Sequence, residues 1–183
     1  MTVIECIKTA ATELGIGERV RGYLDGTTTE GAEEAHELLR CFNLVENELA
    51  LDYLPLFAEE DILTDTGAVY FSDLENKPVR VVEVRDSFGN AVSYRLFPEY
   101  LKTQAGKITV RYAYAPAEKF FPDHSDFTLF ASVRLFAYGM ASEYLTANGL
   151  FEEGAVWDKK YKEAIAAAYR SKPAKRIASR RWA

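Results

Sequence analysis

The side chains best able to do chemistry in this sequence begin with two histidines. His36 stands at helical spacing beside Glu33 and Glu37, and His124 lies between Asp residues in a proline-containing stretch. A metal site would need both histidines brought together with further ligands. No local spacing indicates such a site, so we interpret both histidines as solvated side chains.

The two cysteines, Cys6 and Cys41, fall on predicted helices without metal-ligand spacing. We interpret them as two buried thiols in a reducing compartment, with a disulfide as the alternative.

Two carboxylate clusters, Glu59-Glu60-Asp61 and Glu152-Glu153, are the remaining candidates for acid–base chemistry. Each fits a solvated surface or the first turn of a helix better than a catalytic pair. The chain has no G-x-S-x-G motif and no phosphate-binding loop. The sequence therefore predicts no catalytic residue, no metal ligand and no cofactor, and we expect a protein that is not an enzyme.

Composition places the chain among soluble globular proteins and leaves aromatic surface to spare. Its 183 residues are 48% hydrophobic and 27% charged, a size that suits one domain. No apolar run is long enough to span a bilayer, and we expect no signal peptide. Eleven tyrosines and eleven phenylalanines exceed what a core of this size needs, which favours an interface.

Charge is distributed unevenly along the chain. The net charge is −6, but residues 172–183 carry five cations and no acid, which leaves −11 on residues 1–171. An acidic body with a short basic end is not typical of a surface that clamps DNA.

Helical periodicity appears at both ends of the sequence. Apolar spacing predicts helices over Thr2 to Leu14 and from Glu30 to Tyr53, with a short turn at Arg19 to Leu24 between them. Asp126 to Asn148 is apolar on nearly all sides and is predicted to be a central helix. A last helix over Leu150 to Ser171 is expected to pack Trp157 and Tyr161 near Phe136 and Met140. Trp157 is predicted to be a core residue.

The middle of the sequence changes to strand patterns. Strands are predicted at 57–64, 68–71, 79–85, 91–96 and 106–114, with 97–103 as a connection. The third and fourth of these are expected to form a hairpin around the turn Asp86 to Asn90, which places Phe88 at the tip. Phe88 either folds back on its own sheet or contacts another molecule.

The predicted fold class is α+β: a helical bundle with a small antiparallel β-sheet inserted between the second and third long helices. We expect one domain over residues 1–171, with the β insertion at about 57–114, followed by a basic docking tail at 172–183.

The order of several motifs resembles a known family. GKITVRYAYAP, the helix with LFAYGMASEYLTANG, W-x-x-x-Y on a charged helix and the R-R-W ending follow a long helix and a valine-rich hairpin. This order, over Thr29 to Trp182, resembles the head–tail connector (adaptor) proteins of tailed bacteriophages and prophages.

The resemblance implies a non-catalytic virion protein that assembles in the host cytoplasm into a ring, usually a dodecamer, beneath the portal protein. The ring would receive a stopper or tail-completion protein, and genomic DNA would pass through without specific binding. It would involve no membrane. The carboxy-terminal segment would dock into the portal, and the tail residues suited to this are Arg176, Ile177, Arg180, Arg181 and Trp182. Phe88 would contact a neighbouring subunit or the stopper.

Three alternatives stay open. The chain could itself be a stopper or tail-completion protein. It could also be a cytosolic enzyme, or a small-molecule-binding module that uses a cleft between sheet and bundle.

Overall fold

The computed structural model describes residues 1–127 and 131–170, and these form two compact units. The helical unit comprises Met1–Phe42 and the chain from Phe127 onward, and the β-unit comprises Asn43–Asp126. The protein is α+β, as predicted. Within the described residues, no helix has the length and apolar character needed to cross a membrane.

Short-range signals set the first helices. Helix α1 (Val3–Glu13) begins at Thr2, whose hydroxyl accepts a hydrogen bond from the Glu5 backbone while the Glu5 side chain accepts one from the Thr2 backbone. Helix α2 (Gly17–Leu24) is a full helix where the sequence predicted a short turn. Helix α3 (Ala32–Glu48) continues into a π-helical turn, Leu49–Tyr53, and ends before Pro55.

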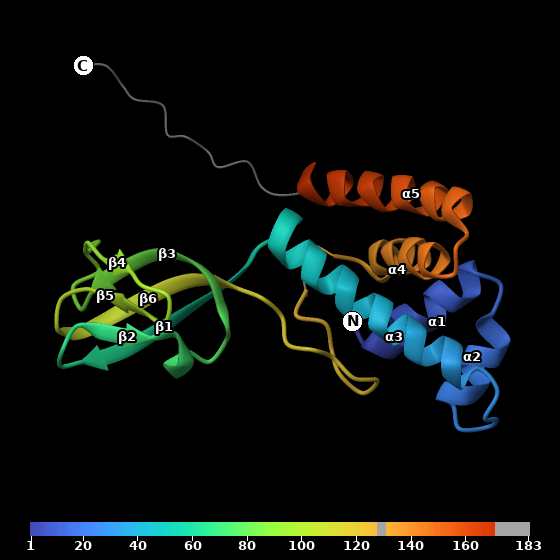
Figure 1. Cartoon of the computed structure of the whole chain (residues 1–183), viewed down its shortest axis with the longest axis horizontal. Helices are drawn as coiled ribbons and strands as arrows, with labels where there is room; N and C mark the ends of the chain where they lie inside the picture. The colour runs from blue at the N-terminus through green and yellow to red at the C-terminus, as the bar shows by residue number, and fades with distance from the viewer. Residues whose placement is uncertain (128–130, 171–183) are drawn as a thin grey trace, which may run out of the picture. The chain divides into compact units, whose positions relative to one another are not determined.

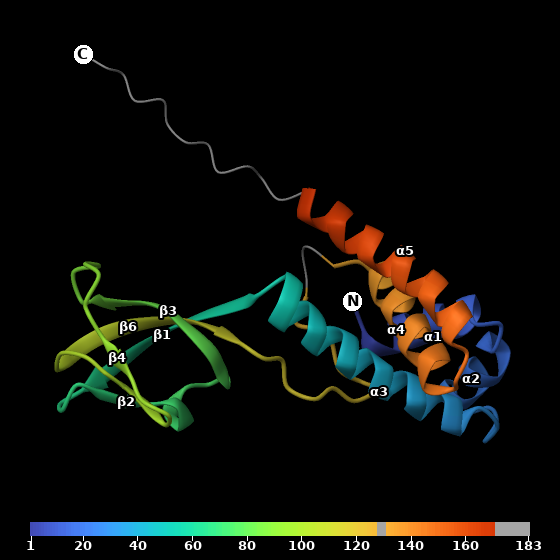
Figure 2. The same cartoon turned by 45° about the horizontal axis from the view of Figure 1, so that its top comes forward.

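Helix α4 lies at the centre of the helical unit. It spans Val133–Ala147 and packs between α1 and α5 (Phe151–Arg170) (Figures 1 and 2). Phe136 is fully buried, stacks on Phe42 at 4.9 Å between ring centroids, and also contacts Phe127 at 6.1 Å. Leu135, Ala137, Met140 and Ala141 are buried with it, which confirms the helix as core.

The start of α4 differs from the prediction. The helix was expected from Asp126, but it begins at Val133 because the Ser132 hydroxyl caps it, accepting a hydrogen bond from the Leu135 backbone at 3.2 Å. Phe127 is buried before the helix begins. Apolar spacing continued upstream of the cap and disguised the boundary.

The packing of α5 also corrects one prediction. Tyr161 is 3% exposed, but Trp157 is partly exposed and packs on Tyr138, at 5.5 Å between ring centroids. The Lys160 ammonium lies 3.8 Å from the centroid of the Trp157 ring. Trp157 therefore lies at the margin of the α4–α5 contact and is not a core residue.

The β-unit contains two three-stranded antiparallel sheets where one was predicted. The strands are β1 (Leu56–Thr64), β2 (Ala68–Tyr70), β3 (Pro78–Asp86), β4 (Arg95–Leu96), β5 (Tyr100–Lys102) and β6 (Gly106–Tyr114). Their orders are β1-β6-β3 and β2-β5-β4. Residues of both sheets share one core, in which Ile108, Val110 and Tyr112 of β6 are fully buried, as their alternation predicted.

The order of elements departs from the predicted arrangement. The strands were placed between the second and third long helices. Because α2 forms as a separate helix, the sheets come after the third helix, α3, and before α4 and α5. The expected hairpin is reduced to an isolated bridge between Arg85 and Ala91, because the chain then leaves β3 and pairs as β4 with β5 in the second sheet. Strand β5 lies in the stretch predicted as a connection.

Candidate interaction site

The turn after β3 presents the one described residue that the sequence singled out for contact. Phe88 is 88% exposed at the tip of the turn Asp86 to Asn90. Of the two outcomes predicted for Phe88, folding back on its own sheet is wrong, because the ring is exposed. The ring gains nothing from water in this position, so the turn displays an apolar group to solvent.

The same turn is held rigidly by one side chain. The Asp86 carboxylate accepts hydrogen bonds from the backbones of Phe88 and Asn90, both at 2.9 Å, and from the Asn90 side-chain amide at 3.2 Å. The Asp86 and Asn90 backbones also bond each other at 2.9 Å. These bonds hold the pKa of Asp86 below its ordinary value. Phe88 is thus displayed on a turn fixed by hydrogen bonds, which would lose little conformational freedom if another molecule bound there.

The remaining predicted contact residues belong to the carboxy-terminal tail. Arg176, Ile177, Arg180, Arg181 and Trp182 lie outside the described residues, as does the whole tail from Lys172.

The histidines show no shared site. His36, on α3, lies with its Nδ1 atom 2.7 Å from the Ala32 carbonyl, to which it donates, and its ring contacts Tyr23. His124 is exposed in the segment after β6. Across residues 1–127 and 131–170, no group of three or more His, Cys, Asp or Glu side chains is arranged to hold a metal ion.

Both cysteines are buried thiols of the helical unit and no disulfide joins them, as the sequence predicted. Burial raises the pKa of Cys41 to about 12. A thiol with such a pKa is almost entirely protonated at neutral pH and is a poor nucleophile.

The carboxylates of Glu59-Glu60-Asp61 alternate across β1 and each has a neighbour on β6. Glu59 pairs with Arg111 at 3.5 Å, and Asp61 accepts from Thr109 at 2.6 Å and pairs with Lys107 at 2.9 Å. Glu60 points the other way and accepts from the Tyr112 hydroxyl. Because successive strand residues face opposite sides, the three carboxylates do not converge as an acid–base pair would require.

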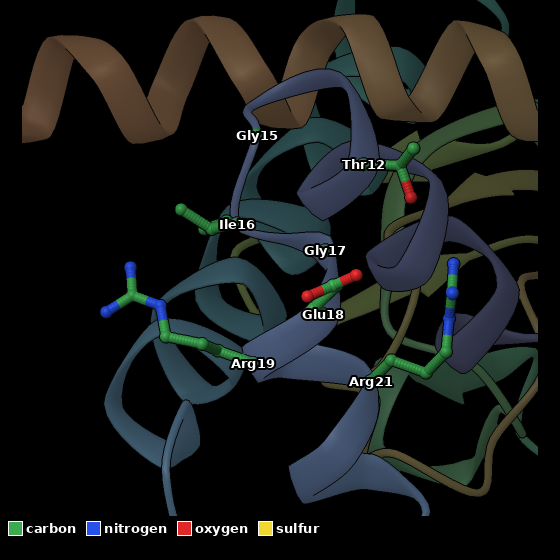
Figure 3. A pocket seen from close by; sticks show the side chains of 7 residues that line it. All are labelled: Thr12, Gly15, Ile16, Gly17, Glu18, Arg19 and Arg21. Carbon is green, nitrogen blue, oxygen red and sulfur yellow. The ribbon is translucent and has the colours of Figure 1, made fainter.

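A hollow at the surface of the helical unit has no converging polar groups. It measures about 400 Å³ and lies where α1 passes into α2 (Figure 3). Figure 3 shows the Arg19 and Arg21 side chains extending on opposite sides of Glu18. Arg19 pairs with Glu34 at 3.1 Å, and the Thr12 hydroxyl donates to the Lys8 carbonyl at 2.7 Å. These partners leave the hollow without an arrangement that would select a ligand.

Sequence reasoning missed a polar cluster inside the β-unit. Glu46 of α3 is 1% exposed, and its Oε1 accepts from the Ser125 hydroxyl at 2.6 Å and the Asp126 backbone at 3.0 Å. Asn43, one turn earlier, bonds both backbone groups of Lys119, whose ammonium pairs with Asp126 at 2.6 Å. The cluster ties the segment 119–126 to the end of α3.

A signal for this cluster was present in the sequence. Glu46 is charged, yet it falls within the apolar stripe formed by Phe42, Val45 and Leu49. A carboxylate at such a position must be buried with hydrogen-bond partners. Its partners lie about eighty positions away, so the spacing could not name them.

Comparisons with known proteins give no assignment: no protein-family model matches this chain, and no curated protein is similar to it.

Proposed function

We propose that this chain is a structural subunit of a bacteriophage or prophage virion, a head–tail connector that assembles into a ring beneath the portal. The observation that carries the proposal is Phe88, an aromatic side chain 88% exposed on a turn fixed by hydrogen bonds. An apolar ring held out to solvent is typical of a protein–protein contact. The order of sequence motifs that resembles connector proteins supplies the class of assembly.

Charge supports the same proposal. Residues 1–171 carry a net charge of −11, so a channel lined by many copies would repel DNA phosphates and let the genome slide past. The basic tail would dock into the portal through Arg176, Ile177, Arg180, Arg181 and Trp182. In this proposal the protein resides at the head–tail interface of the virion, its partners are the portal, other copies of itself and a stopper, and it has no catalytic role.

The mass of the native assembly tests the proposal. The full chain, with a subunit mass of 20.6 kDa, is measured by native mass spectrometry alone and after mixing with the portal protein encoded in the same genome. We expect a closed oligomer and a complex with the portal. The oligomer should be a dodecamer, the usual ring size in the connector family that the sequence resembles. A chain that stays monomeric and does not bind the portal would contradict the connector role.

A further inference from the structure

A second apolar feature of the β-unit lies at the other end of β3 from Phe88. A groove of about 200 Å³ runs between the start of β3 and β4. Its lining residues are Phe71, Pro78, Val79, Arg80, Val81, Leu96 and Phe97. Val79 is 54% exposed and Leu96 is 56% exposed, so the groove offers apolar surface to solvent.

One wall of this groove is fixed by aromatic stacking. Phe97 stacks on Tyr100 with ring centroids 4.6 Å apart and planes at 10°, and its backbone donates to the Tyr100 carbonyl at 2.9 Å. Tyr100 in turn contacts Tyr70 at 5.5 Å. A wall held in this way loses little conformational freedom when another molecule binds.

The position of Phe88 prevents it from filling the groove of its own chain. The groove lies at the first residues of β3 and Phe88 follows the last, and a strand rises about 3.3 Å per residue, so about 20 Å or more separates them. The turn that carries Phe88 is fixed to the end of β3 by the Asp86 hydrogen bonds. The Phe88 side chain of a second copy is not held at this distance and can reach the groove.

Size and charge fit the groove to that same turn. The hollow suits one large side chain, and Phe88 is the most exposed large apolar residue among those described. Arg80 lines the groove and has no ion-pair partner within the described ranges, whereas the turn carries the Asp86 carboxylate. The Asp86 carboxylate of one copy and the Arg80 guanidinium of another would attract each other.

We propose that Phe88 of one copy occupies the Val79–Leu96–Phe97 groove of the next copy. The contact is head-to-tail, because the two surfaces that meet are different patches of the same chain. Such contacts propagate, and they give a ring where the rotation closes and a filament where it does not. The inference rests on the proposed function only for closure into a ring, since the contact itself needs no portal.

Disulfide trapping between two full-length variants tests the contact directly. Phe88→Cys and Val79→Cys proteins are mixed under mild oxidation and resolved on a non-reducing gel. We expect a mixed dimer linked through positions 88 and 79, formed at least tenfold faster than either variant alone forms a dimer. The native Cys6 and Cys41 are fully buried and do not compete.

The matched control replaces Val79→Cys by Phe120→Cys, at a residue 60% exposed in the same unit. Equal trapping with this control would mean random collision and would overturn the proposal. So would dominant pairing of two copies through position 88, or preferential trapping of Trp182→Cys by Val79→Cys, which would make the tail the occupant. Absence of any mixed dimer overturns it as well.

Mass measurements on a second set of variants separate this inference from the proposed function. Phe88→Ser and Leu96→Asp are each expected to weaken self-association at least tenfold, whereas Phe120→Ser leaves it unchanged. All three positions are exposed, so thermal unfolding should stay near wild type. A ring that persists in both groove and tip variants would contradict the contact while leaving the connector role intact. A protein that self-associates through this contact but does not bind the portal would contradict the connector role while leaving the contact intact.

Discussion

Glu46 shows how a single buried carboxylate can tie one segment of the β-unit to another. One oxygen accepts from Ser125 and Asp126, and within the described ranges the other oxygen has no hydrogen-bond partner. Burial raises the pKa of Glu46 above its ordinary value, although the Ser125 hydrogen bond and the nearby Lys119 act in the opposite direction. Desolvation is the largest of these effects, so the folded state favours the neutral acid more than the unfolded chain does.

This shift fixes the sign of a pH dependence. The folded protein holds the Glu46 proton more tightly than the unfolded chain, so Glu46 lowers stability progressively as the pH rises from about 4.5. Glu46→Gln keeps an uncharged acceptor for Ser125. Its unfolding free energy relative to wild type should therefore increase between pH 4 and pH 8, by about 1.4 kcal/mol for each unit by which the pKa is raised.

Urea unfolding of both proteins across this pH range measures the difference. Glu33→Gln, which removes an exposed carboxylate from the same helix, serves as the control. A flat difference for Glu46→Gln would mean that Glu46 ionises normally in the folded protein.

Among the elements, helix α5 depends on α4 for its stability. The two helices pack along each other, and α5 makes no comparable contact with α1 or α2 among the described residues. Tyr161 and Ile165 are buried in this contact, while Trp157 packs at its margin between Tyr138 and Lys160. Most of a helix's stability in a folded protein comes from packing of its apolar face, so the contact with α4 supplies most of the stability of α5.

The loss of unfolding free energy on substitution by alanine along α5 should increase with the burial of the side chain that is removed. Tyr161→Ala is expected to cost about 3–5 kcal/mol of unfolding free energy, the range for buried aromatic residues. Trp157→Ala should cost about 2 kcal/mol, because part of its ring already meets water. Val156→Ala, at a side chain 58% exposed, is the control and should change little. Chemical denaturation gives these values, and a larger loss for Trp157 than for Tyr161 would contradict the assignment of the core.

Elements with strong local signals were predictable, and those decided by distant partners were not. The apolar spacing of α1 and the alternation of β6 are local signals, and both elements appear where the sequence placed them. The apolar alternation of residues 91–96 suggested a strand paired with β3. In the structure only a two-residue strand, β4, forms there, and its partner is β5. For the candidate site, the turn that displays Phe88 was predictable from its Asp-Ser-Phe-Gly-Asn sequence. The groove was not, because η2 (Phe71–Asp73), β3 and β4 meet there only after folding.

Across the whole molecule, charge differs between residues 1–171, which carry a net charge of −11, and residues 172–183, which carry five cations and no acid. Residues 172–183 carry five of the chain's 22 cationic side chains together with Trp182, whereas α5 ends at Arg170. Arginine and tryptophan are the residue types that most often dominate binding energy at interfaces. We therefore expect the tail to contribute to portal binding and the preceding residues to contribute to the fold.

Deletion of Lys175 to Ala183 should leave the melting temperature nearly unchanged, because the helices and strands of the described residues lie before the deleted segment. Binding to the portal, measured by co-purification and by titration, should be lost. Trp182→Ala alone should weaken binding by about 2 kcal/mol or more, since a buried tryptophan anchor contributes at least that much. Arg180→Ala with Arg181→Ala separates the loss of charge from the loss of the ring.

The tail prediction has two outcomes that contradict it. If the truncated protein binds the portal at wild-type affinity, the anchoring surface lies elsewhere in the chain. If truncation instead abolishes a salt-sensitive affinity for duplex DNA while portal binding persists, the tail is a nucleic-acid arm. Residues 1–171, with a net charge of −11, should bind duplex DNA poorly even at low salt, so any strong binding by the full chain would have to come from the tail.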